Sequence, residues 1–135
     1  MNPRLDRYFE SEVLTADPIQ LVTLLYRAAR EAIAAASVAL AAGDIQERSR
    51  NIQKAWEIIH ELDRVLDRQR GGDISRQLAE LYAYVGQKLL DANTQQSQQG
   101  LDDAAAVLAI LAEAWQGVQK HQTAEVLSGP MLVTC

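Results

Sequence analysis

Apolar residues recur at alternating intervals of three and four along most of this chain. That spacing places them on one face of an α-helix, and it holds in four separate segments. The segments cover residues 17–42, 44–70, 73–93 and 97–120. At a rise of about 1.5 Å per residue, each predicted helix is roughly 30–40 Å long. The apolar positions are, in chain order, Leu21, Leu25, Ala28, Ala32, Ala35, Ala39; Ile45, Ile52, Trp56, Ile59, Leu62, Leu66; Ile74, Leu78, Leu81, Val85, Leu89; and Leu101, Ala104, Leu108, Leu111, Trp115, Val118.

Residues that favour helix ends stand between these segments. Asp44 and Ser97 can each accept a hydrogen bond from an unpaired backbone N–H at a helix start, and Asp17-Pro18 offers the same acceptor followed by a proline suited to the first helical position. Gly71-Gly72 separates the second segment from the third, and Asn93 tolerates the left-handed conformation that often ends a helix. The predicted helices are therefore joined by short turns. Short turns force neighbouring helices to run antiparallel, so we predict an all-α fold, an antiparallel up-down-up-down four-helix bundle, over residues 17–122.

The second half of the first helix, Ala32–Ala42, consists almost entirely of small residues. Small side chains allow the backbones of two helices to approach closely. They can also leave a shallow groove that another chain fills. Tight packing within the bundle is the commoner outcome, and the pattern alone leaves both open.

The two ends of the chain differ from the bundle. Residues 1–16 contain five large apolar residues, which a solvated tail seldom needs, so we predict an N-terminal arm that packs on an apolar patch of the bundle. These are Leu5, Tyr8, Phe9, Val13 and Leu14. In residues 123–135, Gly129-Pro130 is expected to break any helix, and this C-terminal tail either docks or is disordered.

Composition narrows the classes of function. The chain is 48% hydrophobic but only 5% aromatic, with 3 Pro residues, which favours helix. Its net charge of −5 argues against a nucleic-acid partner, which requires a basic face. No apolar stretch reaches the length of about 20 residues that membrane insertion requires. The single cysteine, Cys135, allows no intrachain disulfide, which fits a cytoplasmic protein.

Candidate catalytic chemistry is sparse. Glu57 and His60 match the Glu-x-x-His spacing of di-iron bundles once, but His121 provides no second copy, so we expect no metal. The adjacent acids Asp102 and Asp103 suit the positive end of a helix dipole better than acid–base catalysis. No nucleophile or phosphate-binding motif is present in the sequence. We expect no cofactor and no enzymatic activity.

Short pieces of sequence, taken in order, resemble a known family. They are Tyr8, Val13, Thr15-Ala16-Asp17-Pro18, Gln20-Leu21, Leu25-Tyr26, Gly43-Asp44, Lys54 to Leu62, Leu78 to Tyr84, Leu89 to Asn93, and Glu113-Ala114-Trp115. Over about residues 5–118 the chain resembles the flagellar export chaperones of the FliS family. It departs from the family pattern at Leu101–Ala106, where the family usually has more acidic and branched residues, and after Lys120.

The resemblance implies a cytosolic chaperone that binds the disordered C-terminal segment of flagellin in an apolar groove. It implies that the protein prevents premature polymerisation and delivers flagellin to the flagellar export gate protein. The arm would occupy the groove when it is empty. A non-catalytic helical adaptor or scaffold is the alternative, and homodimer formation is left open.

Nine residues are candidates for partner binding on this basis. Leu5, Tyr8 and Val13 would act as arm and docking residues, with Leu5 and Tyr8 associated with the export gate. The groove would be lined by the second and third helices through Ile52, Trp56, Ile59, Leu81, Val85 and Leu89. Most of these six could equally form the bundle core, which is the commoner fate of an apolar helix face.

Overall fold

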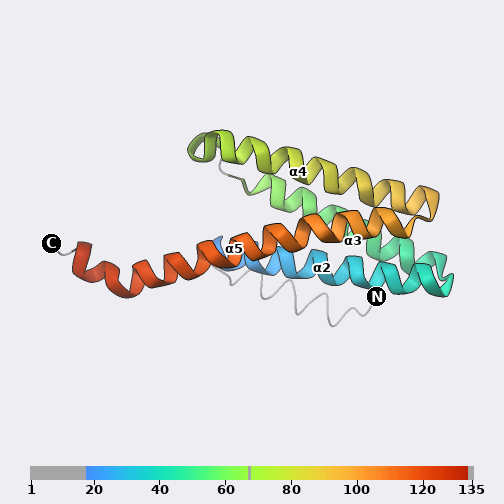
Figure 1. Cartoon of the computed structure of the whole chain (residues 1–135), viewed down its shortest axis with the longest axis horizontal. Coiled ribbons are helices and arrows are strands. Elements are labelled where there is room, and N and C mark those ends of the chain that lie inside the picture. Colours follow the sequence, from blue (N-terminus) through green and yellow to red (C-terminus); the bar gives the residue numbers. More distant parts are fainter. Residues whose placement is uncertain (1–17, 67, 134–135) are drawn as a thin grey trace.

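The computed structural model describes residues 18–66 and 68–133, and it describes side chains as far as Lys120 except at residues 67, 68 and 70. Four helices account for nearly all of these residues, and the described part contains no strand. They are α2 (Pro18–Ala42), α3 (Ile45–Arg64), α4 (Arg68–Gln95) and α5 (Gln98–Val133) (Figure 1). The prediction of an all-α fold is confirmed.

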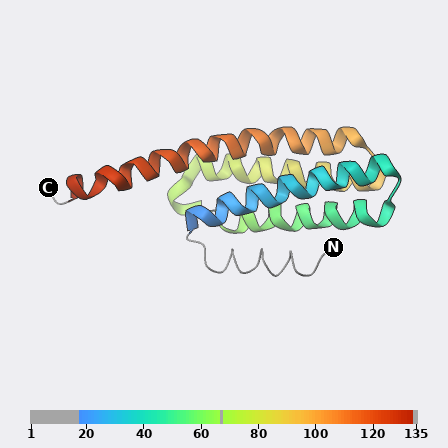
Figure 2. The ribbon, with the colours of Figure 1, turned by 90° about the horizontal axis from the view of Figure 1, so that it is seen from below.

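Each helix packs against two neighbours. The helix α2 contacts α3 and α5, and α4 contacts the same two helices from the other side. Consecutive helices run antiparallel because short turns connect them, as Figure 2 shows. The arrangement is the predicted up-down-up-down bundle. The predicted arm, residues 1–16, lies outside the described residues.

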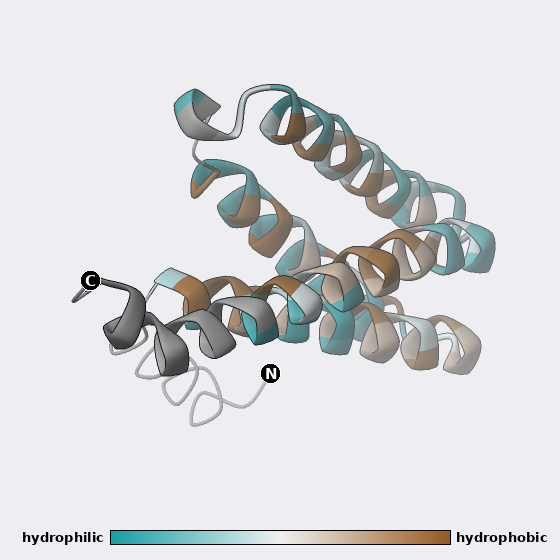
Figure 3. Cartoon of the chain, turned by 60° about the vertical axis from the view of Figure 1, so that its left-hand side comes forward, coloured by the Kyte–Doolittle hydropathy of each residue, from teal (hydrophilic) through white to brown (hydrophobic). Residues whose placement is uncertain are grey.

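All four helices contribute to one hydrophobic core. Figure 3 shows that hydrophobic residues lie on the sides of the helices that face one another. The largest fully buried side chains are Ile52, Ile59 and Leu62 of α3, Val85 and Leu89 of α4, and Leu101 and Leu108 of α5. The helix α2 contributes smaller residues, and Ala29 and Ala36 are completely buried. At these positions the alanine-rich first helix packs tightly in the bundle, which is one of the two alternatives that its sequence left open.

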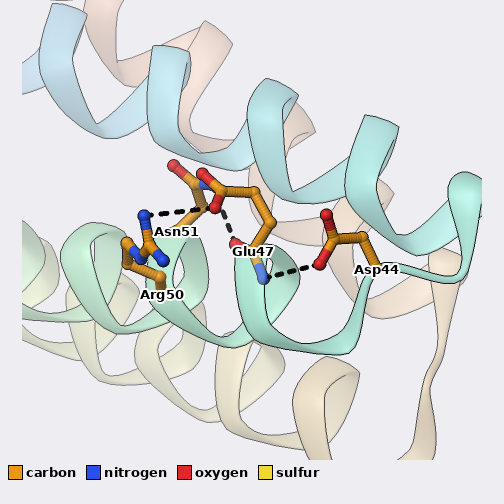
Figure 4. Close-up of polar contacts among 4 residues, drawn as sticks. All are labelled: Asp44, Glu47, Arg50 and Asn51. Carbon is orange, nitrogen blue, oxygen red and sulfur yellow. Dashed lines mark hydrogen bonds and ion pairs between the residues drawn. The ribbon is translucent and has the colours of Figure 1, made fainter. Parts of the chain in front are cut away.

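The predicted N-caps of two helices are confirmed. Asp44 precedes α3, and its Oδ1 accepts a hydrogen bond from the Glu47 backbone N–H at 3.1 Å (Figure 4). Glu47 also forms an ion pair with Arg50 at 3.2 Å. At the start of α5, Ser97 Oγ accepts a hydrogen bond from the Gly100 N–H at 3.2 Å. Both caps pair a backbone N–H that the first helical turn cannot satisfy.

Two predicted helix ends need correction. The helix α3 ends at Arg64 rather than at residue 70, and α4 already begins at Arg68. The predicted interruption at Gly71-Gly72 is present as a kink within α4, because Gly72 is not helical, with a φ of 51° and a ψ of −122°. Such a positive φ suits a residue without a Cβ.

The end of α4 also differs from the prediction. The helix continues to Gln95, and the residue with a positive φ is Gln96, at 54°, rather than Asn93. Asn93 instead bonds to α3, because its Oδ1 accepts hydrogen bonds from Arg48 Nε at 3.2 Å and Ser49 Oγ at 3.1 Å. Its amide therefore joins two helices rather than ending one.

The predicted helix break at Gly129-Pro130 is wrong. The helix α5 passes through both residues and ends at Val133, so its end projects beyond the other three helices (Figure 1). Proline fixes φ near −65°, which is a helical value, although inside a helix it removes one backbone hydrogen bond and crowds the preceding turn. In the part of the chain that the structure describes, no helix is long and apolar enough to cross a membrane.

Candidate binding groove

A hollow lies between α2 and α5, and we call it the α2–α5 groove. Its volume is about 800 Å³. Alanines of both helices form much of its lining, namely Ala34, Ala105, Ala106, Ala109 and Ala112. Larger apolar parts come from Tyr26, Ile33, Leu101 and Trp115. The space is therefore a mainly apolar recess in the surface of the bundle.

The alanines explain why this seam is not filled. Ala105, Ala109 and Ala112 follow one another at intervals of four and three, so they share one side of α5. Opposite them, α2 presents Ala34 and Ser37. Methyl groups on both helices are too short to close the space between the backbones. The groove interpretation of the alanine-rich first helix therefore holds on the side that faces α5.

Side-chain hydrogen bonds link the two helices at each end of the groove. At one end, Trp115 Nε1 donates to Thr23 Oγ1 at 2.8 Å. The Thr23 hydroxyl also lies 3.1 Å from Gln119 Oε1. At the other end, Gln98 Nε2 donates to Ser37 Oγ at 2.7 Å. The two ends are bridged, and the middle is open.

Charged residues stand on the rim. Arg27, Arg30 and Glu31 of α2 and Asp102 of α5 line the groove and are exposed. An apolar floor with a polar rim of both signs fits the two faces of an amphipathic helix.

A pair of tyrosines lies beneath the groove. The hydroxyl oxygens of Tyr26, which lines it, and Tyr82 of α4 are 2.6 Å apart and buried. Burial disfavours the phenolate and raises the pKa of both groups, and the hydrogen bond to Tyr26 raises the pKa of Tyr82 further. Both hydroxyls remain neutral at physiological pH, and one donates a hydrogen bond to the other inside the bundle.

Four of the six residues predicted to line a groove between the second and third helices lie in the core. Ile52, Ile59, Val85 and Leu89 are at most 2% exposed. Each occupies the centre of the helix face that turns toward the other three helices. In this structure they fill the bundle interior, which is the alternative that the sequence left open.

The other two predicted groove residues are accessible. Leu81 is 38% exposed, and it shares an edge of α4 with the exposed Ile74 and Tyr84. This edge faces α5, because Lys88 on the same edge forms an ion pair with Asp103 at 3.6 Å. The edge is therefore a second apolar surface, separate from the α2–α5 groove.

Trp56 of α3 is partly exposed and lies over α4. A Cβ added to Gly86 would be 3.7 Å from the indole, which is ordinary contact. The rings of Trp56 and His60 have centroids 3.7 Å apart, and His60 Nδ1 lies 3.0 Å from the Trp56 carbonyl oxygen. The histidine thus packs beside the indole on the outer surface of α3.

The predicted docking residues of the arm, Leu5, Tyr8 and Val13, lie outside the described residues. Their role stays a prediction. Among the residues that the structure does describe, no group of three or more His, Cys, Asp and Glu side chains could hold a metal ion.

Known proteins place this bundle in a family. A family model described as "Flagellar protein FliS" matches residues 1–122. The chain belongs to the FliS family. The resemblance found in the sequence motifs is thereby confirmed, and the matched range ends close to Lys120, after which the motifs stop.

Two relatives illustrate the similarity. The flagellar secretion chaperone FliS of Salmonella typhimurium is 36% identical over 110 residues, which cover 81% of this chain and 82% of that protein. The flagellar secretion chaperone FliSB of Pseudomonas aeruginosa is 35% identical over 109 residues, covering 81% and 86%. Family membership places the chain among flagellar secretion chaperones.

The sequence missed the lining of the groove, although a signal was present. Ala105 and Ala106 belong to the alanine-rich start of the fourth helix, where the chain departs from the family pattern. Small residues on one helix predict either close contact or a hollow. The hollow could have been inferred only by knowing that this side of α5 faces Ala34 and Ser37 of α2.

Proposed function

We propose that this chain is a cytosolic, non-catalytic chaperone that binds the disordered C-terminal segment of flagellin. Bound flagellin cannot polymerise prematurely and is delivered to the flagellar export gate. The single observation that carries this proposal is the open, alanine-lined α2–α5 groove in a bundle of the FliS family.

The groove suits a segment that becomes helical on binding. Thr23 and Ser37, which mark its two ends, are about four helical turns apart on α2. An amphipathic helix can lay its apolar side on the alanines and keep its polar side at the charged rim. A disordered segment loses conformational entropy when it orders, so binding depends on burying apolar surface along the whole groove.

Residues 1–16 are proposed to cover the groove when flagellin is absent. This arm ends two residues before Pro18, and the groove begins at Thr23, little more than one helical turn further along α2. Its five large apolar residues need an apolar surface. Displacement by flagellin would free Leu5 and Tyr8 for the export gate protein.

A substitution that fills the groove tests its role. Ala109→Leu adds bulk in the middle of the lining, whereas Ala114→Leu adds the same bulk at an exposed position of α5 outside it. We expect Ala109→Leu to weaken binding of a flagellin C-terminal peptide about tenfold or more, because the floor is occupied. Ala114→Leu should leave the affinity unchanged. Calorimetry measures both, and circular dichroism should show a gain in helix on binding.

Other outcomes have clear meanings. Equal affinities for the two leucine variants would exclude the α2–α5 groove as the docking site and favour the exposed edge of α4. An absence of binding at tens of micromolar, where weak contacts still register, would favour a helical adaptor that joins folded partners.

A further inference from the structure

A single hydroxyl group organises one end of the α2–α5 groove. Thr23 Oγ1 lies 2.8 Å from Trp115 Nε1, 3.1 Å from Gln119 Oε1 and 3.3 Å from the Ile19 carbonyl oxygen. An indole N–H can only donate, so the hydroxyl accepts from Trp115. Its one hydrogen is then directed to Gln119 or Ile19. The hydroxyl thus connects α2 with α5 through their side chains.

This bond fixes the largest side chain that lines the groove. Trp115 is partly buried and lines the groove. Before Trp115, the α5 residues of the lining that lie nearest in the helix, Ala109 and Ala112, carry only methyl groups, and Gln116 follows the indole. Without the acceptor at Thr23, the indole N–H would lose its partner and the ring would lose a constraint on its orientation.

The other end of the groove is held differently. The Gln98–Ser37 hydrogen bond joins the flexible side chain of Gln98 to the small side chain of Ser37 at an exposed position. Exposed hydrogen bonds of this kind exchange readily with water and contribute little to stability. The two ends are therefore unequal: one presents a fixed aromatic wall, and the other presents polar side chains.

We propose that Thr23 is a positioning residue that holds Trp115 as the end wall of the groove and so sets the register of the bound helix. The proposal rests on the function proposed above. It assigns the ligand a pattern: small residues such as Ala, Ser or Gly over the alanine floor, and one large apolar residue against the indole of Trp115. Aromatic surfaces of this kind often supply much of the binding energy of an interface.

Thr23→Val and Thr23→Ser form a matched pair for the test. Valine keeps the branched shape and removes the hydroxyl, whereas serine keeps the hydroxyl. In ¹⁵N-labelled full-length protein, Trp56 and Trp115 give two indole N–H signals, and Trp115→Phe assigns them. We expect Thr23→Val to shift the Trp115 signal and leave that of Trp56 in place. Thr23→Ser and Ser37→Ala should leave both signals unchanged.

Binding of the flagellin C-terminal peptide provides the second readout. We expect Thr23→Val to weaken binding roughly three- to tenfold, as loss of one oriented contact would, and Thr23→Ser to restore it. Thermal unfolding of each variant controls for folding. A peptide in which the large apolar residue is moved by one helical turn should bind wild-type protein less tightly, and should lose less affinity with Thr23→Val.

The possible results separate the two proposals. An unmoved Trp115 signal in Thr23→Val would show that the hydroxyl does not hold the ring and would overturn the inference. A moved signal with wild-type affinity would overturn the role in register. If wild-type protein bound no flagellin peptide, the proposed function would fail, and the role of Thr23 in setting the register would fail with it. The Trp115 indole signal would still report whether Thr23 positions the ring.

Discussion

Arg48 is a charged side chain that lies buried between helices. It is only 7% exposed, although it belongs to a helix rich in charged residues. Its Nε donates to Asn93 Oδ1 at 3.2 Å, and Ser49 donates to the same oxygen. A buried charge needs such an acceptor, because water cannot reach it. The polar cluster therefore joins the start of α3 to the end of α4.

Removing the acceptor should destabilise the bundle. Asn93→Ala removes the Asn93 Oδ1 acceptor and leaves the Arg48 guanidinium, among the residues that the structure describes, the residue 93 carbonyl oxygen, which lies 3.5 Å from Arg48 Nη2. We expect a loss of about 1–3 kcal/mol in the free energy of unfolding, measured by urea denaturation. Gln87→Ala removes an exposed hydrogen bond to Asp91 on the same helix and should cost much less. Equal losses in the two variants would contradict the role given to Asn93.

The tyrosine pair predicts how stability depends on pH. The pKa of Tyr26 and of Tyr82 is raised above the ordinary value of 10.0, mainly by burial. The folded chain therefore holds these protons more tightly than the unfolded chain. The resulting stabilisation is complete below pH 10 and is lost as the pH rises above that value. Between about pH 7 and 9, this pair should cause no change in stability.

A double substitution isolates this effect. Stability measured by denaturation from about pH 9 to 11 should fall less steeply in the Tyr26→Phe, Tyr82→Phe variant than in wild type. Tyr84 is 43% exposed, so Tyr84→Phe should keep the wild-type slope. A wild-type slope in the double variant would show that these hydroxyls do not govern the alkaline loss of stability.

At the scale of the helix, α4 shows which buried residues the apolar periodicity predicts and which it misses. The sequence predicted an apolar face through Leu81, Val85 and Leu89, and the last two are buried. The core continues through Tyr82 instead of Leu81. Tyr82 can be buried because Tyr26 of α2 satisfies its hydroxyl. A partner that lies 56 positions away cannot be read from the periodicity of one helix.

Trp56 is the predicted docking residue of α3 that remains accessible. If it binds a client, Trp56→Ala should weaken binding of the flagellin peptide by about tenfold or more, as loss of an aromatic contact does. Its partial exposure predicts a smaller stability loss than that of Ile59→Ala, a buried control expected to cost about 2–5 kcal/mol. Calorimetry and urea denaturation give the two quantities. Unchanged affinity would remove Trp56 from the docking residues.

At the scale of the whole molecule, the sequence predicts the bundle better than its groove. The number and order of helices in the described part of the chain, and the caps at Asp44 and Ser97, follow from local patterns. Local patterns cannot say which alanines face one another. Ala36 is completely buried, whereas Ala34, two residues earlier, lines an open recess. That difference depends on where α5 lies, which is a property of the assembled bundle.

The arm gives the last prediction at this scale. Deleting residues 1–16 should leave the bundle folded, because its core is built from α2, α3, α4 and α5. If the arm covers the α2–α5 groove, the deletion exposes apolar surface, and the fluorescence of a hydrophobic dye should rise severalfold. Adding Ala109→Leu to the deletion variant fills the groove and should reverse most of that rise, whereas Ala114→Leu should not.

A rise that persists with Ala109→Leu would place the arm on another surface, such as the edge of α4 around Leu81. No rise at all would mean that residues 1–16 cover no apolar surface of the bundle, and the client would then meet an open groove without having to displace the arm.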